Sequence, residues 1–301
     1  MTAVSGAGPS AAPVPAGARP GWFRTGDGIR LRWLEWGSPD APALVLLHGL
    51  RSYAATFEHL AQRLSGRWRC VALDARGRGG SDWDPRRDYH TDRYVRDLSE
   101  FAGELGLTRF ALLGHSMGGA TAMAWAAAHP GRLDALVVED MLPGSSVSGA
   151  GAARIRREVA DIPDGFPDRA AAIAYWWRLR PTATVAAIES RVRHTLRPAR
   201  EGSPELRWIP DMPGIGAARL DRTRPPADLW ATVPALPART LVVCGGDSDF
   251  TSAATLAEIR HRNPAIATAV IDGAGHYVHD DRPRPFADRV EAFLDGAGRA
   301  A

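Results

Sequence analysis

The sequence predicts an α/β fold, a doubly wound and mostly parallel sheet with a helical cap inserted after the sixth strand. Continuous apolar runs alternate with helical stretches, and this alternation is typical of parallel strands covered by helices on both faces. The alternation stops at residue 143 and resumes near residue 237, which indicates an inserted segment. A glycine-rich turn at 114–119 joins an apolar run to an alanine-rich helix.

The first half of the chain contains six predicted strands. Residues 22–24 and 29–36 flank Asp27 and Gly28, a pair that favours a hairpin turn. The next four strands are short apolar runs, as expected for strands buried on both faces, and they cover 43–47, 70–73, 110–113 and 135–138. Helical patterns lie between them at 54–64, 94–105 and 120–128.

Residues 143–236 interrupt this order. They contain helical stretches such as 170–179 and proline-rich loops, and they lack the apolar runs typical of buried strands. After them come a strand at 240–244, a helix at 253–262, a strand at 267–271 and a helix at 286–294. We therefore expect a core of residues 21–142 and 237–301. Residues 143–236 are expected to form a helical cap (lid) over the carboxyl ends of the strands, where open α/β sheets place their ligands. A second, independent domain is the alternative.

Composition narrows the class of protein. The 301 residues are 45% hydrophobic and carry a formal net charge of +3, as in ordinary soluble globular proteins. The basic residues are arginines scattered among acids, and the missing basic stripe argues against a nucleic-acid partner. No run approaches the roughly 20 apolar residues that span a membrane.

Cysteine usage and the N-terminal residues indicate the compartment. Cys70 and Cys244 fall inside predicted buried strands and are expected to be free thiols. Residues 1–20 are rich in Ala, Gly, Ser and Pro and lack the apolar core of a secretory signal, so we expect a flexible extension. Together these features favour a cytoplasmic protein.

The motif Gly-His-Ser-Met-Gly at 114–118 carries the strongest chemical signal. It matches the nucleophile elbow, a sharp turn between strand and helix that lifts a serine hydroxyl clear of the sheet. Gly114 and Gly118 leave room for the turn, and Ser116 lies at a helix N-terminus, whose N–H groups favour an oxyanion. A structural turn with an unused serine is the alternative. The strand before the motif and the helix after it favour a nucleophilic Ser116.

Five motifs, in order along the chain, resemble those of the α/β-hydrolase fold family. They are His48-Gly49, residues 74–82, the turn at Ser116, the turn at 245–249 and Gly275-His276. The resemblance covers nearly everything after Gly21, and the serine in its GHSMGG context is most similar to esterases and lipases. Haloalkane dehalogenases and epoxide hydrolases carry an aspartate at the nucleophile position, so Ser116 argues against both.

A serine nucleophile needs a base, and the base needs an acid. His276 is the expected base because it follows a predicted strand and a glycine turn and precedes the last helix. His279 is a competitor that lacks this turn. Asp249 and Asp140 both follow predicted strands, and their order along the chain does not choose between them. The resemblance implies Asp249, at the usual position of the family, with Asp140 as the alternative acid and Asp247 last.

An oxyanion and a substrate must also be held. The N–H group of Met117 is one expected oxyanion donor, and the resemblance implies that of Leu50 as the second. Arg51 and Tyr53 extend the same loop and are candidates for substrate binding or solvated loop residues. No residues have the spacing of metal ligands and no dinucleotide motif occurs, so we expect no metal and no cofactor.

Aromatic residues are frequent in the predicted cap. Each of them alone is most simply a core residue, but together they suggest the roof of an apolar pocket. They are Tyr175, Trp176, Trp177, Trp208 and Trp230, of which Trp176 and Trp177 are the candidates for substrate contact.

These features together predict a serine hydrolase that cleaves carboxylic esters with a hydrophobic acyl or alcohol part through an acyl-enzyme. A thioesterase, a C–C hydrolase or an acyl-transferring or ring-closing enzyme would use the same residues and is an alternative. A ligand receptor on the same scaffold is a third interpretation. The expected partner is a small-molecule ester or acyl substrate, and a homodimer is left open.

Overall fold

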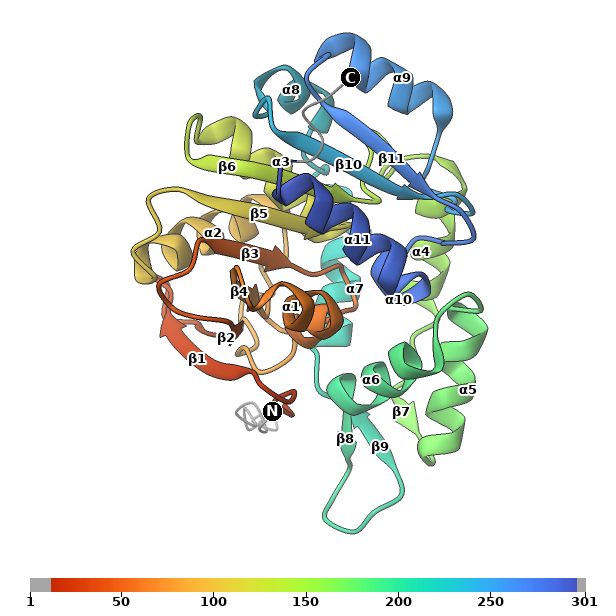
Figure 1. The fold of residues 1–301 in the computed structure, drawn as a ribbon. Coiled ribbons are helices and arrows are strands. Elements are labelled where there is room, and N and C mark those ends of the chain that lie inside the picture. Colours follow the sequence, from red (N-terminus) through yellow and green to blue (C-terminus); the bar gives the residue numbers. More distant parts are fainter. Residues whose placement is uncertain (1–11, 297–301) are drawn as a thin grey trace.

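A computed structural model describes residues 12–296 of the chain (Figure 1). Its main feature is an eight-stranded sheet with the strand order β1-β2-β4-β3-β5-β6-β10-β11. The first two strands of this order run antiparallel to their neighbours, and all other pairs are parallel. The predicted α/β fold with a mostly parallel sheet is therefore confirmed.

The central strands are buried on both faces because their sequences are continuous apolar runs. In β3 (Ala43–Leu47), Val45 packs in the hydrophobic core on one face, whereas Leu44 and Leu46 pack on the other. The remaining strands are β1 (Arg19–Arg24), β2 (Arg30–Trp36), β4 (Arg69–Leu73), β5 (Phe110–His115), β6 (Leu133–Glu139), β10 (Thr240–Gly245) and β11 (Ala267–Ile271).

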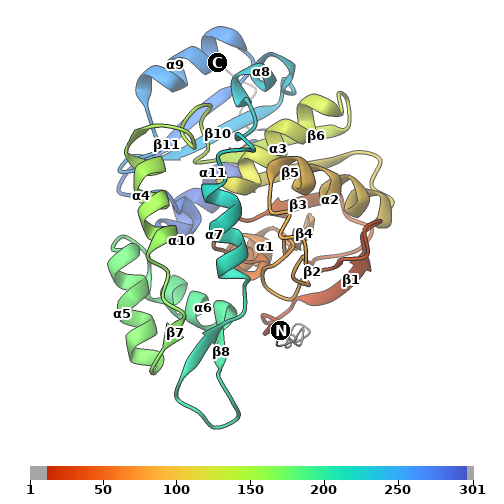
Figure 2. The ribbon, with the colours of Figure 1, turned by 180° about the vertical axis from the view of Figure 1, so that it is seen from behind.

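Helices cover both faces of the sheet (Figures 1 and 2). One face carries α1 (Glu58–Leu64) and α11 (Pro283–Leu294), whose apolar residues join the same core cluster. The other face carries α2 (Thr91–Glu104), α3 (Met117–Ala128), α8 (Leu229–Thr232) and α9 (Ala253–Arg262). Three short helices also belong to this part of the molecule, and they are η1 (Ala54–Phe57), η2 (Val233–Ala235) and α10 (Val278–Asp281).

The chain between β6 and β10 forms a separate group of elements. Besides α8 and η2, it contains α4 (Gly149–Ala160), β7 (Gly165–Phe166), α5 (Arg169–Leu179), α6 (Val185–Thr195), β8 (Leu196–Pro198), β9 (Leu206–Trp208) and α7 (Met212–Leu220). In Figure 1 most of this inserted segment lies to the lower right of the sheet. Its three short strands pair in the order β7-β9-β8. We did not predict this small sheet, because strands of two or three residues leave no apolar run in the sequence.

The N-terminal residues differ in part from the expectation of a flexible extension. Residues 1–11 lie outside the described part of the chain. Ala12 is buried, and its carbonyl accepts a hydrogen bond from Arg32 Nη1 at 2.7 Å. Because β1 begins at Arg19 and pairs with β2, residues 19 and 20 belong to the sheet and not to an extension.

Two further expectations bear on the described residues. Cys70 and Cys244 are buried, free thiols, as predicted. Burial raises the pKa of both thiols, to about 12 for Cys70, so neither ionises near neutral pH. Within residues 12–296, no helix combines the length and the apolar character that a membrane crossing requires.

Candidate active site

The turn between β5 and α3 presents Ser116 at the carboxyl edge of the sheet. Ser116 has φ +52° and is the N-cap of α3, and its N–H donates to the Glu139 carbonyl at 2.9 Å. A Cβ on Gly118 would lie 2.2 Å from the Leu47 carbonyl oxygen, and one on Gly114 would lie 2.2 Å from the Gly118 oxygen. Only glycine fits at these two positions, which explains the motif in steric terms.

His276 lies between Ser116 and Asp140. Its Nε2 is 2.9 Å from Ser116 Oγ, and its Nδ1 is 2.7 Å from Asp140 Oδ2. An ionised carboxylate only accepts hydrogen bonds, so Nδ1 carries the proton and Nε2 is free to accept one from the serine. The imidazole also stacks on Phe250, with 4.1 Å between the ring centroids. This arrangement holds a serine, a histidine and an aspartate in one hydrogen-bonded line.

Asp140 follows β6 directly and is fully buried. Its Oδ1 accepts hydrogen bonds from Gly245 N at 3.0 Å and Thr251 Oγ1 at 3.1 Å, and its Oδ2 accepts one from Ser248 Oγ at 2.5 Å. Several donors around one carboxylate fix its orientation. Asp140 is thus a rigid acceptor for His276.

The structure does not bring Asp249 to His276, which corrects our preferred choice of acid. Asp249 is exposed on the surface and binds Arg154, which donates from Nε at 2.7 Å and from Nη2 at 2.8 Å. Partial burial would raise the pKa of Asp249, but the hydrogen bonds and charge of Arg154 outweigh it and lower that pKa. Asp247, the third candidate, is exposed as well.

The two expected oxyanion donors lie beside Ser116. Leu50 and Met117 line the same pocket as the serine. Within the described residues, neither backbone N–H donates to another protein group. The Leu50 carbonyl accepts a hydrogen bond from Arg78 Nε at 3.2 Å, which helps to hold this loop in place. Both N–H groups are therefore available to a ligand.

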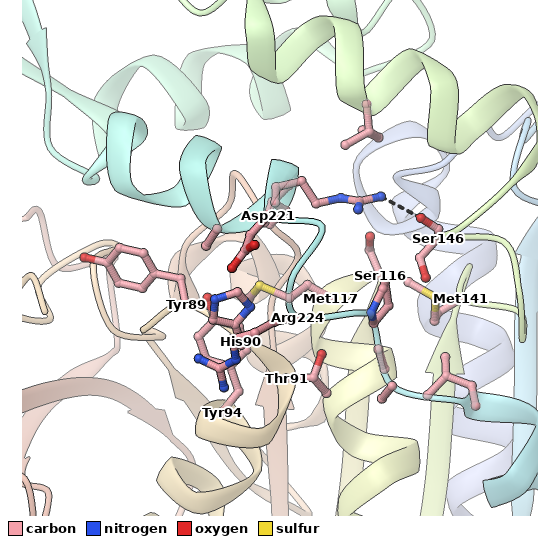
Figure 3. Close-up of a pocket in the computed structure, with 18 of the residues that line it drawn as sticks. Tyr89, His90, Thr91, Tyr94, Ser116, Met117, Met141, Ser146, Asp221 and Arg224 are labelled. Carbon is pink, nitrogen blue, oxygen red and sulfur yellow. Dashed lines mark hydrogen bonds between the residues drawn. The ribbon is translucent and has the colours of Figure 1, made fainter. Parts of the chain in front are cut away.

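A cavity of about 440 Å³ opens next to Ser116 and His276 (Figure 3). One part of its wall is apolar and is formed by Ala120, Met141, Ile155, Leu229 and Phe250. Another part is polar and is formed by Tyr89, His90, Thr91, Asp92, Asp221 and Arg224. Figure 3 shows Tyr89, His90 and Asp221 grouped on one side of Ser116, with Met141 and Ser146 on the other. Such a site can hold a ligand that has an apolar part and a polar part.

Of the four predicted substrate-binding residues, only Arg51 lines this cavity. Tyr53 is buried elsewhere, where it stacks on His194 and binds Ser190 Oγ at 2.9 Å. Trp176 is fully buried in the core of the inserted segment, and Trp177 packs against that core. Trp176 instead packs with Tyr175 and Trp208, because the inserted segment needs a core of its own. Trp230 packs against the core of the main sheet.

Three further buried residues lie around the line of Ser116, His276 and Asp140. The sequence analysis did not place His115 and Glu139 in the site, and it named His279 only as the competitor of His276. His115 donates from Nε2 to the His276 carbonyl at 2.9 Å. Glu139 accepts at Oε1 from His279 Nδ1 at 2.7 Å and from His279 N at 3.0 Å. His115 and Glu139 immediately precede Ser116 and Asp140 in the chain. That adjacency was the signal that could have revealed them.

The same three residues, His115, Glu139 and His279, are the group that could hold a metal ion among the described residues, with ligand atoms within 4.8 Å of one another. Burial would lower the pKa of His279, but the Glu139 carboxylate outweighs it and raises that pKa. Burial, followed by the charges of His279 and His276, holds the pKa of His115 well below its usual range. Two atoms of this group, His115 Nδ1 and Glu139 Oε2, are buried without a hydrogen-bond partner among the described residues.

A parallel sheet with a serine at the β5–α3 turn and a histidine after β11 defines α/β enzymes with a nucleophile elbow. The family model for the alpha/beta hydrolase fold matches residues 42–283, and the chain belongs to this family. This confirms the resemblance drawn from the sequence motifs.

Relatives of known name agree with this assignment. The chain is 31% identical to mouse sn-1-specific diacylglycerol lipase ABHD11 over 265 residues, which cover 86% of this chain and 82% of that protein. It is 30% identical to 2-(acetamidomethylene)succinate hydrolase of Mesorhizobium japonicum over 267 residues, which cover 89% of this chain and 92% of that protein. A crystal structure of E-2-(acetamidomethylene)succinate hydrolase has a TM-score of 0.81 at 28% identity and covers 92% of this chain and 99% of that one. The protein is thus an enzyme, a hydrolase.

Proposed function

We propose that this enzyme is a serine hydrolase that cleaves carboxylic esters with a hydrophobic acyl or alcohol part. Ser116 is the nucleophile, His276 the base and Asp140 the acid. The observation that carries the proposal is the hydrogen-bonded line from Ser116 Oγ through His276 to Asp140. Ser116 and His276 of this line both face the cavity.

Acylation follows from these positions. Ser116 Oγ attacks the ester carbon while its proton moves to His276 Nε2. Asp140 accepts the Nδ1 hydrogen bond and stabilises the imidazolium that forms. The N–H groups of Leu50 and Met117 bind the oxyanion of the tetrahedral intermediate. The C–O bond to the alcohol then breaks, and His276 returns the proton to the leaving oxygen.

Deacylation repeats the same steps with water. His276 Nε2 takes a proton from a water molecule, whose oxygen attacks the acyl carbon of the ester formed on Ser116. The oxyanion again binds the N–H groups of Leu50 and Met117. When the bond to Ser116 Oγ breaks, His276 returns the proton to the serine, and the carboxylic acid leaves.

The cavity supports a substrate with an apolar part. Its apolar wall combines Ala120 and Met141 of the core with Ile155 and Leu229 of the inserted segment. The name of the mouse relative refers to a diacylglycerol, an ester with long apolar chains. Since the inserted segment contributes part of the wall, we propose that residues 143–236 act as a cap over the core of residues 21–142 and 237–301.

Replacement of the nucleophile tests the function. Ser116→Ala should fold normally and lose several orders of magnitude in kcat on 4-nitrophenyl butyrate, since loss of one member of such a triad costs nearly as much as loss of all three. A fluorophosphonate probe should label the wild-type protein at Ser116, as read by peptide mass spectrometry.

Ser65→Ala, at a partly exposed position that does not line the cavity, is the matched control and should keep both turnover and labelling. Wild-type turnover by Ser116→Ala would disprove the mechanism. A single slow burst in the wild-type protein, without steady turnover, would favour a ligand receptor over an enzyme.

A further inference from the structure

Arg219 lies in the pocket without a carboxylate partner. It belongs to α7 and lines the same cavity as Ser116 and His276. Its Nη2 donates to the Ser146 carbonyl at 2.7 Å, the bond drawn as a dashed line to Ser146 in Figure 3. Among residues 12–296, no Asp or Glu oxygen lies within 4.0 Å of its guanidinium. Burial, and after it the charge of Arg156, lower the pKa of Arg219.

A second arginine of the cavity wall, Arg51, belongs to a buried group with surplus positive charge. Arg51 and Arg180 both pair with Glu158, and Arg191 pairs with Asp280 at 2.6 Å. Glu158 also pairs with Arg154, which pairs in turn with Asp249, so four guanidinium groups share three carboxylates. Arg51, Arg180 and Arg191 are almost completely buried, so water screens the surplus poorly.

The surplus positive charge of these arginines acts on Tyr277, the residue that follows His276. Its hydroxyl accepts a hydrogen bond from Arg180 Nη2 at 2.6 Å, and its ring lies against Arg180 and Arg191. Burial would raise the pKa of Tyr277, but the charges of Arg180, Arg191 and Arg51 outweigh it and lower that pKa to about 8. Since Tyr277 lines the cavity, an anion bound there meets a positive potential.

At the opposite end of the cavity, the arginine of the wall is paired with carboxylates. Arg224 also lines it, but its guanidinium already binds Asp88 at 2.7 Å and Asp92 at 2.8 Å. In Figure 3, Arg224 and Asp221 lie beside His90, away from Ser146. The charge of Arg224 is therefore compensated by carboxylates, whereas that of Arg219, on the side of Ser146, is not.

We propose that the substrate carries a carboxylate in addition to its ester, and that Arg219 binds this carboxylate. The proposal rests on the proposed function, because it names the substrate class of the same site. A guanidinium offers two parallel N–H groups that match a carboxylate, and such charge-assisted pairs are strong where water is partly excluded. The apolar wall of the cavity then holds the hydrocarbon part of the same molecule.

Matched esters test this proposal. One pair carries the carboxylate in the acyl half, 4-nitrophenyl hydrogen adipate against 4-nitrophenyl hexanoate. The other carries it in the alcohol half, 3-carboxyphenyl butyrate against 3-acetylphenyl butyrate. In at least one pair, the wild-type enzyme should have a higher kcat/KM for the charged ester. Arg219→Met should lower the charged-to-neutral ratio by about 10- to 100-fold, the range for a hydrogen bond to a charged group. The loss should fall mainly on KM.

Two further variants separate a direct contact from a general effect of charge. Arg156→Met removes the same charge from an exposed neighbour that does not line the cavity, and it should leave the ratio unchanged. Arg219→Lys keeps the charge but loses the paired N–H groups, so it should recover part of the ratio lost in Arg219→Met.

Binding measurements keep this proposal distinct from the proposed function. The affinity of Ser116→Ala for the two esters of each pair, measured by calorimetry, requires no turnover. Tighter binding of a charged ester that disappears in the Ser116→Ala, Arg219→Met double variant supports the carboxylate site even if esters are not hydrolysed. The carboxylate site would be overturned if, in both pairs, the charged and neutral esters had equal kcat/KM with the wild-type enzyme and equal affinity for Ser116→Ala.

Discussion

At the residue scale, the choice between Asp140 and Asp249 shows what the proposed base, His276, requires of its acid. Both follow neighbouring parallel strands, β6 and β10, so both lie at the same edge of the sheet. Asp140 is fully buried and fixed by four donors, whereas Asp249 is exposed and held by Arg154. A fixed, buried carboxylate holds one tautomer and one ring orientation, which a surface ion pair cannot do.

The two aspartates should respond differently to the same substitution. In Asp140→Asn the amide favours the wrong tautomer of His276, so kcat for 4-nitrophenyl butyrate should fall by up to about 10⁴-fold. Asp249→Asn removes one partner of a partly exposed ion pair, which costs at most about 1 kcal/mol of stability, and turnover should stay near normal.

Circular dichroism and thermal unfolding should first show that both variants are folded, because a collapsed strand end would imitate lost catalysis. A crippled Asp249→Asn beside a nearly normal Asp140→Asn would return the role of acid to β10. The assignments of Ser116 and His276 would survive that result.

At the element scale, the turn between β5 and α3 depends on its contact with β3. The Leu47 carbonyl, at the end of β3, touches the backbone of Gly118 so closely that a Cβ would lie 2.2 Å away. The position of Ser116 is therefore set by the packing of one element on another and not by the turn alone. A shift of the helix N-terminus would also move the Met117 N–H, one of the two proposed oxyanion donors.

Gly118→Ala should separate activity from folding. The added methyl group forces the turn away from β3, so we expect a loss of about 1–3 kcal/mol in the free energy of unfolding, as for other overpacked sites. Turnover should fall much further than stability, because both Ser116 and Met117 move.

Gly103→Ala is the matched control for this substitution. Gly103 lies in α2, and a Cβ there would have no neighbour within 4 Å. Alanine favours helices over glycine by up to about 1 kcal/mol, so this variant should be as stable as the wild type or more stable. Urea unfolding and ester turnover measure both effects. An active Gly118→Ala of normal stability would contradict the steric account.

The same contacts explain how far the sequence could predict this molecule. Buried strands and the elbow leave local signals, since an apolar run and a Gly-x-Ser-x-Gly turn are continuous in the chain. The acid could not be chosen, because Asp140 and Asp249 differ only in which donors surround them after folding. Trp176 was placed at the ligand because hydrophobicity does not tell a core residue from a pocket wall. The short strands β7 to β9 pair too few residues to show in any periodicity.

At the scale of the whole molecule, the cavity lies where two parts of the chain meet. Buried ion pairs cross between them: Arg51 binds Glu158 of α4, and Arg191 of α6 binds Asp280. Tyr89 also donates from its hydroxyl to Asp211 Oδ2 at 2.9 Å. These contacts fix the inserted segment against the core, so the apolar wall they share has a defined size.

A defined apolar wall should select the length of the substrate chain. Each methylene buried there adds roughly 0.8 kcal/mol, so kcat/KM for 4-nitrophenyl esters should rise about fourfold per carbon until the cavity is full, and then fall. Ala120→Phe places a ring on the apolar wall and should shift the optimum to shorter acyl or alcohol chains. Val185→Phe makes the same kind of enlargement on the exposed surface of α6 and should leave the optimum unchanged. A flat profile in the wild type, or an optimum that Ala120→Phe does not move, would show that this wall does not hold the hydrocarbon chain.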